Sequence, residues 1–250
     1  MKQRIEFLKD ASKICFDAWE EVKKYPIKVY NKKDGSIVTN VDIALHKILK
    51  ERFYDLEGVA VYSEEDGKET KKYPSTHILI DPIDGTKGFR DGLEGQYVSL
   101  VSYVIDGQLE AAIMYDPINS VAYWASPEKG AYIYWPETNI IGLLKANLNP
   151  RGVIVISCSD SIAEKELENY KIKKLHSAIK FIKPVTGEAF AYIREIPMKR
   201  WDFEAGICIA KEAGCIVTCT FSNTEKITRL SVINPHMEQC EFLKKERNRQ

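Results

Sequence analysis

The stretch "IDPIDGTKGF", residues 80 to 89, places two carboxylates three positions apart and follows the second at once with Gly-Thr. The preceding apolar run "THILI" predicts a strand. The proline after Asp81 indicates that the chain leaves the sheet there, because proline cannot donate to a strand ladder. Two carboxylates held close together repel each other unless a cation or a proton lies between them. The sequence therefore predicts that Asp81 and Asp84 lie at the rim of a sheet and bind a hard divalent cation such as Mg²⁺.

Glu64 in "YSEEDG" and Asp202 in "RWDFEAG" are further candidate ligands. Taken singly, each acidic residue also has a plain structural explanation. Glu64 and Glu65 can be solvated loop acids, Asp84 can form a turn with Gly85, and Asp202 can cap a helix. Taken together, these acids would bring carboxylate oxygens from distant parts of the chain to one metal site.

The first half of the chain contains two predicted helices followed by a run of strands. Apolar residues at helical spacing predict a helix ending near Lys24. A second helix is expected to begin at Thr39, with Asp42 three residues later as in a capping box. Short apolar runs over residues 97–134 predict an antiparallel meander, with Asp106-Gly107 as a hairpin turn.

The stretch "ETNIIGLLKANLNPRG" lacks strand alternation and suggests a domain boundary near residue 145. We expect an α+β metal-binding domain over residues 1–145 and an α/β substrate-recognition domain over residues 146–250. The second half alternates predicted strands ("VIVIS", "IKKLH", "AFAYI", "CIVTCT") with predicted helices ("SIAEKELENY" and a helix from Asp202 to Gly214). Pro184 should interrupt the segment that begins "SAIKFI", and the tail "KKERNRQ" should be a frayed charged end.

Composition excludes some classes of protein. The 250 residues are 44% hydrophobic, which is enough for a sizeable core, and carry 36 basic and 36 acidic side chains. Such a balance disfavours a protein that binds nucleic acid polymers through a net basic face. The charged amino terminus predicts neither a signal peptide nor a transmembrane segment, so we expect a cytoplasmic protein. Six scattered cysteines without metal-ligand spacing are interpreted as reduced core thiols.

The motifs "KDGSIVTNVD", "SEED", "DPIDGTKGF", "VIVIS" and "WDFEAG" occur in this order along most of the chain. This ordered set resembles the inositol monophosphatase superfamily of Mg²⁺-dependent, lithium-sensitive phosphatases, and most closely its 3′(2′),5′-bisphosphate nucleotidase branch. The resemblance implies a layered αβαβα sandwich with two or three Mg²⁺ ions between its α+β and α/β halves. It also implies inhibition by lithium.

Carried over by position, the resemblance implies a set of metal ligands made of the side chains of Glu64, Asp81, Asp84 and Asp202 and the backbone carbonyl of Ile83. Thr86 matches the threonine that orients the attacking water. A hydroxyl gains basicity only by relay to a carboxylate, here Asp42 or Glu64. Asp42 matches the acidic residue of the "VTxxD" motif. Its alternative explanation is the capping box with Thr39, and one residue can serve both purposes.

The turn after Asp84 is expected to contact the phosphate. Gly85 permits a backbone with positive φ, and the amides of Gly85 and Thr86 at a helix start are suited to bind an anion. Lys87 matches the "DGTK" form of the nucleotidase branch, and its alternative explanation is an ordinary surface cation. Asp202 is expected to face the substrate as well as the metal.

Substrate choice depends on "HSAIKF", where the nucleotidase branch has Gly-Ser-Ser-x-Lys-Phe. Ser177 and Lys180 match that motif, whereas His176 and Ala178 replace a glycine and a serine. We expect Lys180 to pair with the retained phosphate, Ser177 to donate to it and Arg194 to add a contact. The alternative explanation for Arg194 is a charge at the end of a strand.

The resemblance favours a phosphatase that converts 3′-phosphoadenosine 5′-phosphate, a by-product of sulfate transfer, to AMP and phosphate. The first alternative is an inositol monophosphatase or a related polyol-phosphate phosphatase. A catalytically inactive sensor of phosphate ligands is the second. Homodimers occur among the relatives, and the sequence leaves the oligomeric state open.

Overall fold

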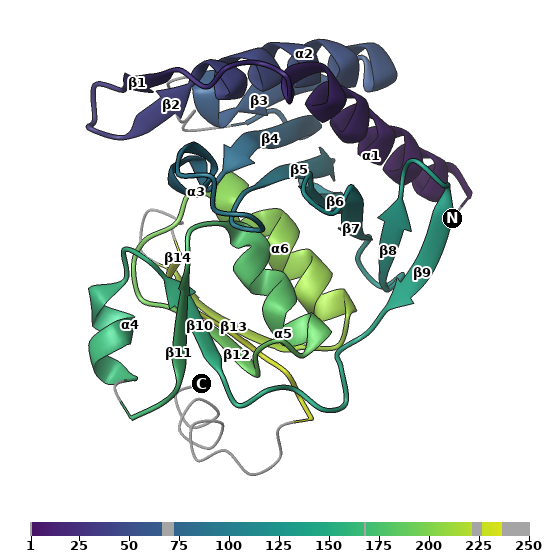
Figure 1. Cartoon of the computed structure of the whole chain (residues 1–250). Helices are drawn as coiled ribbons and strands as arrows, with labels where there is room; N and C mark the ends of the chain where they lie inside the picture. Colours follow the sequence, from purple (N-terminus) through teal and green to yellow (C-terminus); the bar gives the residue numbers. More distant parts are fainter. Residues whose placement is uncertain (1, 67–72, 168, 222–226, 237–250) are drawn as a thin grey trace.

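The computed structural model describes residues 2–66, 73–167, 169–221 and 227–236. Its elements stack as five layers in the order α, β, α, β, α (Figure 1). Helices α1 (Lys2–Val22) and α2 (Asn40–Glu57) form the first layer, and a seven-stranded sheet is the second. Helices α5 (Ile182–Thr186) and α6 (Arg200–Glu212) lie between this sheet and a five-stranded one, whose outer face carries α4 (Ser161–Glu166). The predicted layered sandwich is confirmed.

The seven-stranded sheet has the order β3-β4-β5-β6-β7-β8-β9, and its strands are antiparallel except for the parallel pair β3 and β4. Their bounds are β3 (Ala60–Ser63), β4 (His77–Asp84), β5 (Val98–Ile105), β6 (Gln108–Asp116), β7 (Val121–Ala125), β8 (Ala131–Trp135) and β9 (Ile140–Leu144). The predicted meander is confirmed, but its last strand was missed. β9 lies in the stretch read as irregular, because an edge strand with apolar residues on both faces does not alternate.

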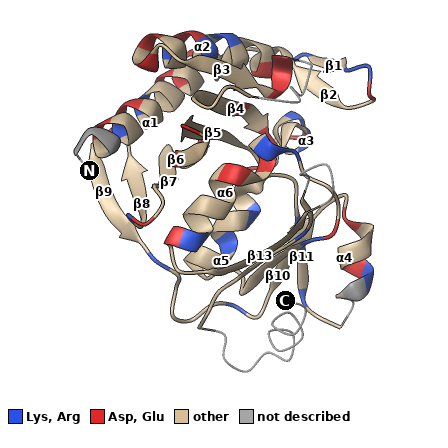
Figure 2. Cartoon of the chain, turned by 180° about the vertical axis from the view of Figure 1, so that it is seen from behind, with Lys and Arg blue, Asp and Glu red and all other residues tan. Residues whose placement is uncertain are grey.

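The outer helices bury one apolar stripe each against this sheet. Thr39 caps α2, and the Asp42 carboxylate accepts a hydrogen bond from the Thr39 amide at 2.7 Å, so the predicted capping box is present. Trp19 of α1 and Leu45 of α2 are buried in the resulting core. Basic and acidic residues are interspersed along α1, α2 and α4 (Figure 2). Within the described residues, no helix is both long and apolar enough to cross a membrane.

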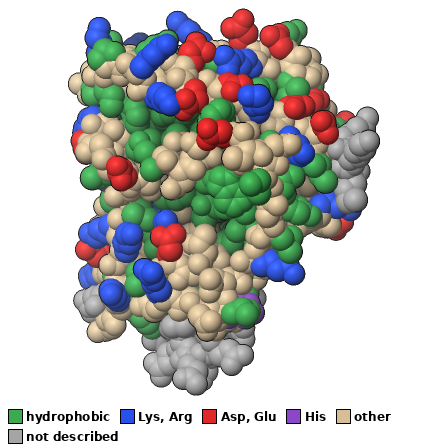
Figure 3. All heavy atoms as spheres, turned by 45° about the vertical axis from the view of Figure 1, so that its right-hand side comes forward, with side chains coloured by type: hydrophobic (Ala, Val, Ile, Leu, Met, Phe, Trp, Pro, Cys, Tyr) green, Lys and Arg blue, Asp and Glu red, His purple; other side chains and the backbone are tan. Residues whose placement is uncertain are grey.

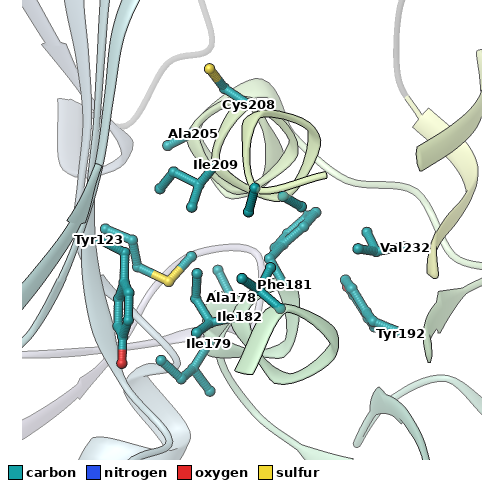
Figure 4. Close-up of a cluster of buried hydrophobic side chains, with 14 of the residues drawn as sticks. Tyr123, Ala178, Ile179, Phe181, Ile182, Tyr192, Ala205, Cys208, Ile209 and Val232 are labelled. Carbon is teal, nitrogen blue, oxygen red and sulfur yellow. The ribbon is translucent and has the colours of Figure 1, made fainter. Parts of the chain in front are cut away.

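The middle layer is built from η2 (Ala178–Phe181), α5 (Ile182–Thr186) and α6 (Arg200–Glu212). Pro184 does not interrupt this segment, contrary to the sequence expectation. It lies in the first turn of α5, where a backbone N–H has no intrahelical partner to lose. Phe181 packs between α6 and the ring of Tyr192, with ring centroids 5.0 Å apart (Figure 4).

The five-stranded sheet has the order β11-β10-β12-β14-β13. Its strands are β10 (Ile154–Ser157), β11 (Ile172–Leu175), β12 (Ala191–Arg194), β13 (Ile216–Phe221) and β14 (Ile227–Ile233). β10 is parallel to β11 and β12, whereas β14 is antiparallel to both of its neighbours. β14 was not predicted. Helix α4 (Ser161–Glu166), capped by Asp160, is shorter than the sequence suggested.

One hydrophobic cluster joins the two halves, since it contains Met114 of the first sheet, Ile209 of α6 and Val232 of the second sheet. The chain passes between the sheets after Leu144 and enters the second at Ile154. A division into two domains near residue 145 stays a prediction. The cysteines of the described residues have free thiols, and the predicted charged tail and Cys240 lie outside those residues.

We expect Gly206→Ala to destabilise the protein by about 1–3 kcal/mol, as overpacking of a core does. A methyl group at Gly206 of α6 would lie closer than 3.0 Å to the ring of Phe181. Thermal unfolding measures the effect. The double variant Gly206→Ala with Phe181→Leu should lose less stability than the sum of the two single variants, because leucine leaves room for the added methyl group. Strictly additive effects of the two substitutions would contradict this contact.

Candidate metal centre

The site begins with an irregularity in β4. Asp81 lies opposite Leu100 of β5 and Asp84 lies opposite Val98, so β4 carries one extra residue between them. This β-bulge changes the facing of side chains, because residues three apart in a regular strand point to opposite faces. The chain therefore does not leave the sheet at Pro82, as the sequence suggested, and Asp81 is only 1% exposed rather than at a rim.

Two hydrogen bonds hold the bulge. The Ser99 hydroxyl donates to the Pro82 carbonyl at 2.6 Å, and the Trp19 indole N–H donates to the same hydroxyl oxygen at 2.8 Å. All three groups are buried. Pro82 and the hydrogen bond to its carbonyl thus hold the backbone of β4 in place between Asp81 and Asp84.

Glu64 and Asp202 reach Asp81 from different layers. The parallel register of β3 and β4 pairs Ser63 with Ile80, so Glu64, the next residue, comes beside Asp81. Asp202 is in the first turn of α6, which packs against β4. One carboxylate oxygen from each of the three residues lies within 4.8 Å of the others.

This arrangement fits a cation. Asp81 Oδ1 is buried and has no hydrogen-bond partner among the described residues. Burial, and then the charges of Glu64, Asp84 and Asp202, raise the pKa of Asp81 well above its usual value. Burial, followed by the charges of Asp84 and Glu64, raises the pKa of Asp202 to about 7. Clustered carboxylates with an unpaired buried oxygen are the donor set that hard cations prefer, so these residues would hold Mg²⁺.

Asp84 connects the two halves of the molecule. Its Oδ2 accepts a hydrogen bond from the backbone amide of Ala178, the first residue of η2. Burial raises the pKa of Asp84, while Lys180 and the Ala178 amide act in the opposite direction. The charge of Glu64 also raises the pKa of Asp84, but the group of carboxylate oxygens within 4.8 Å of one another consists of Glu64, Asp81 and Asp202. A role of Asp84 as a metal ligand stays a prediction.

A chain of hydroxyl and carboxyl groups leads away from the carboxylates. The Thr86 hydroxyl lies 3.2 Å from Asp42 Oδ1 and 3.1 Å from the carbonyl oxygen of Ile83, and can donate to either. The other oxygen of Asp42 accepts from the amide and the hydroxyl of Thr39. Asp42 therefore serves both the capping box and Thr86. Its burial raises its pKa, against the lowering effect of these hydrogen bonds.

Lys32 lies at this site and was not among the residues selected from the sequence. It follows β1 (Val29–Asn31), which pairs with β2 (Ile37–Thr39) in a hairpin. Its Nζ lies 3.5 Å from Glu64 Oε1 and 2.6 Å from Glu65 Oε1. Burial alone would lower the pKa of Lys32, but these carboxylates raise it overall. The sequence contained one indication of this position. Because β2 ends at Thr39, which contacts Asp42, the hairpin that precedes Thr39 must lie near the site.

The residues expected to bind substrate differ in burial and in hydrogen-bond partners. Lys180 is buried, its ammonium donates to the carbonyls of Leu175 and Ser177, and burial lowers its pKa to about 8. The Ser177 hydroxyl caps η2 by accepting from the amide of Ile179 at 3.3 Å. These polar contacts support the backbone that carries the Ala178 amide. Contact of Lys180 and Ser177 with a substrate phosphate stays a prediction.

The remaining two candidates are Arg194, eight residues before Asp202, and Lys87, three residues after Asp84. Arg194, at the end of β12, donates to the carbonyl oxygens of Ile196 and Pro197 at 3.2 and 3.3 Å. Its positive charge also acts on Asp84 and Asp202. Lys87, in the short helix α3 (Thr86–Arg90), is exposed. Roles in substrate binding stay predictions for both.

Comparison with known proteins agrees with this fold. The family model described as "Inositol monophosphatase family" matches residues 1–248. The 3′(2′),5′-bisphosphate nucleotidase CysQ of Shigella flexneri is 30% identical over 200 residues, covering 77% of this chain and 80% of the relative. A protein described as a putative Nus factor SuhB, from Neisseria meningitidis serogroup B, is 27% identical over 200 residues, covering 76% and 75%.

Solved structures show the same architecture. An IMPase of Thermotoga maritima superposes with a TM-score of 0.77 at 20% identity, covering 94% of this chain and 93% of that one. An IMPase/NADP phosphatase complexed with Mg²⁺ and phosphate gives a TM-score of 0.71 at 17% identity, covering 94% and 90%. The fold and the clustered carboxylates define a layered α/β protein with a candidate site for hard cations. The chain belongs to the inositol monophosphatase family, as the ordered motifs predicted.

Proposed function

We propose that the chain is a Mg²⁺-dependent phosphatase that removes the 3′-phosphate of 3′-phosphoadenosine 5′-phosphate and releases AMP. The observation that carries the proposal is the convergence of Glu64, Asp81 and Asp202 around a buried, unpaired carboxylate oxygen. A member of the family that is described with Mg²⁺ and phosphate supports the cofactor. The nucleotidase relatives at about 30% identity support the substrate.

The chain's own residues would divide the work as follows. Glu64, Asp81, Asp84, Asp202 and the carbonyl of Ile83 would hold the cations, which we propose to number two or three. Bound Mg²⁺ would bind phosphate oxygens, activate a water and neutralise charge on the leaving group. Asp202, which arrives on α6, would also face the substrate. The amides of Gly85 and Thr86, with Lys87, would bind the departing phosphate.

Thr86 would align the attacking water. A hydroxyl is too weak a base to take a proton by itself, but Asp42 lies within hydrogen-bond distance and can accept from it. Glu64 is a second carboxylate available for the proton. Lys32, paired with Glu64 and Glu65, would hold the hairpin against the site.

We expect Thr86→Val to lower kcat about 100-fold, because valine keeps the shape of threonine but cannot donate to Asp42 or align a water. Phosphate release measures the loss. Thr86→Ser, which keeps the hydroxyl, is the matched control and should retain most of the rate. Because Thr86 contributes no metal ligand in this proposal, Mg²⁺ should raise the Tm of all three proteins alike. Full activity of Thr86→Val would remove Thr86 from the mechanism.

A panel of phosphate esters tests the substrate. With Mg²⁺, the protein should release phosphate from 3′-phosphoadenosine 5′-phosphate faster than from inositol 1-phosphate, with kcat/KM higher by about tenfold or more. The Asp84→Asn variant gives the background rate. The reverse order would favour the inositol monophosphatase alternative, which the IMPase-like fold keeps open.

Ligand binding without phosphate release from any ester would instead favour an inactive sensor. We also propose that lithium inhibits turnover and that the protein acts in the cytoplasm on the by-product of sulfate transfer. Added Li⁺ should slow phosphate release in the same assay.

A further inference from the structure

The bulge of β4 is held by a side chain of the neighbouring strand. Between Asp81 and Asp84, two residues of β4 lie opposite the single residue Ser99 of β5. A bulge of this kind locally disrupts the backbone ladder. The hydrogen bond of 2.6 Å from the Ser99 hydroxyl to the Pro82 carbonyl therefore acts at the point where the ladder is interrupted.

Trp19 of α1 fixes the direction of this hydrogen bond. Its indole N–H donates to the Ser99 hydroxyl oxygen at 2.8 Å. An indole can donate but cannot accept, so the Ser99 hydroxyl must use its own hydrogen for the Pro82 carbonyl. Charged side chains gather at the top of the face drawn in Figure 3, where Figure 1 shows the outer helices. Trp19 is only 5% exposed, so it lies on the inner side of α1 and its hydrogen bond is shielded from water.

The ring of Trp19 also contacts the segment that follows Asp84. Its centroid lies 5.8 Å from that of Phe89 and 5.9 Å from that of Tyr97, and the rings of Phe89 and Tyr97 are themselves 5.0 Å apart. Phe89 belongs to α3, which begins at Thr86, two residues after Asp84. One side chain of the outer layer therefore supports the chain both before and after Asp84.

Trp124 shows that a tryptophan can fill this core without such a contact. It is 1% exposed and belongs to the same hydrophobic cluster as Trp19, but its indole N–H has no hydrogen-bond partner among the described residues. Packing alone thus accounts for a buried indole in this layer. It does not account for the two successive hydrogen bonds that lead from Trp19 through Ser99 to the bulge.

We propose that Trp19 and Ser99 are positioning residues of the candidate metal centre, and that their hydrogen bonds set its affinity for Mg²⁺. The carbonyl that they hold lies between Asp81 and Asp84, so a shift of this carbonyl would move both carboxylates. Replacing a group that orients metal ligands typically changes metal affinity about 10- to 100-fold. The inference rests on the proposed function, because it concerns the same cations.

Isothermal titration calorimetry of the metal-free protein with Mg²⁺ alone tests the proposal without a substrate. Trp19→Phe keeps an aromatic ring but lacks the N–H, and its dissociation constant for Mg²⁺ should rise about tenfold or more. Ser99→Ala, which removes the hydroxyl, should bind Mg²⁺ at least as weakly. Trp124→Phe is the matched control, because it removes an indole N–H that has no partner, and it should bind Mg²⁺ like the unmodified protein. Circular dichroism and Tm show that each variant is folded at the temperature of the titration.

The double variant Trp19→Phe with Ser99→Ala tests whether Trp19 acts through Ser99. It should bind Mg²⁺ about as weakly as Ser99→Ala alone, because the acceptor of the indole N–H is already missing there. Independent losses that multiply in the double variant would overturn this connection. An unchanged dissociation constant in Trp19→Phe, or an equal loss in Trp124→Phe, would overturn the inference alone. An unmodified protein that does not bind Mg²⁺ would overturn the proposed function and the inference together.

Discussion

Replacing Asp81 with asparagine is expected to abolish activity and, at the same time, to make the metal-free protein more stable. Asparagine is a poorer ligand than a carboxylate, so phosphate release should fall about 1000-fold or more, equivalent to ~4 kcal/mol in activation free energy. The metal-free protein should become more stable because the ionised Asp81 side chain is buried and is repelled by neighbouring carboxylates, whereas asparagine carries no charge. A gain of ~1 kcal/mol in the free energy of unfolding would raise the Tm by roughly 2–4 °C in a protein of this size.

The sign of the pH dependence follows from the raised pKa of Asp81. An acid whose pKa is higher in the folded protein destabilises the fold once it ionises, so the penalty is absent in acid and grows as the pH rises above the pKa of the unfolded chain. The gain in Tm from Asp81→Asn should accordingly be large at pH 8 and vanish near pH 4. In the unmodified protein, Mg²⁺ should also raise the Tm, because it binds the folded chain alone.

Asp116→Asn is the matched control for this experiment. Asp116 is 2% exposed, but its carboxylate accepts hydrogen bonds from the amides of Ile118 and Asn119 and from the Asn119 side chain. Its replacement should therefore lower the Tm and leave the response to Mg²⁺ intact. If Asp81→Asn behaved in the same way, Asp81 would be a structural residue.

We expect Gly85→Ala to be the most damaging change of a single methyl group near the site. Gly85 has φ of +94°, and a Cβ there would lie closer than 3.0 Å to the carbonyl oxygen of Gln96 and to Ser177. The variant would push apart the backbone segments that bring the Ala178 amide to Asp84. The free energy of unfolding should fall by about 1–3 kcal/mol from overpacking and by about 1 kcal/mol more from backbone strain. Activity should fall with stability.

Gly214→Ala separates these two effects. Gly214 has φ of +93°, but a methyl group there would meet no atom within 4 Å. This variant carries the same backbone strain without the contact, so its Tm should fall by less and its activity should persist. Equal losses for the two variants would mean that the contact of Gly85 with Gln96 and Ser177 does not matter.

Local signals in the sequence were sufficient for many of the elements. The Thr39 and Asp42 capping box and the Asp106-Gly107 turn each act over a few residues, so their residue types predicted them. The strands β1, β2, β3, β9 and β14 were not predicted. β9 pairs with the strand just before it and was missed because its apolar residues do not alternate, whereas β14 also pairs with β12, which is distant in the chain. Pro184 was misjudged because its effect depends on its position within a helix, and residue type does not state that position.

The candidate site shows the same division. From the sequence alone came the acidic residues, their order along the chain and the family, because ligand chemistry and motif order are properties of residue types. Only the tertiary structure decided how they meet: the bulge at Pro82, the parallel register that brings Glu64 beside Asp81, and the packing of α6 that delivers Asp202. It also placed Lys32 at the site and internal carbonyls around Lys180. These outcomes depend on contacts between segments far apart in sequence, and no short pattern encodes such distances.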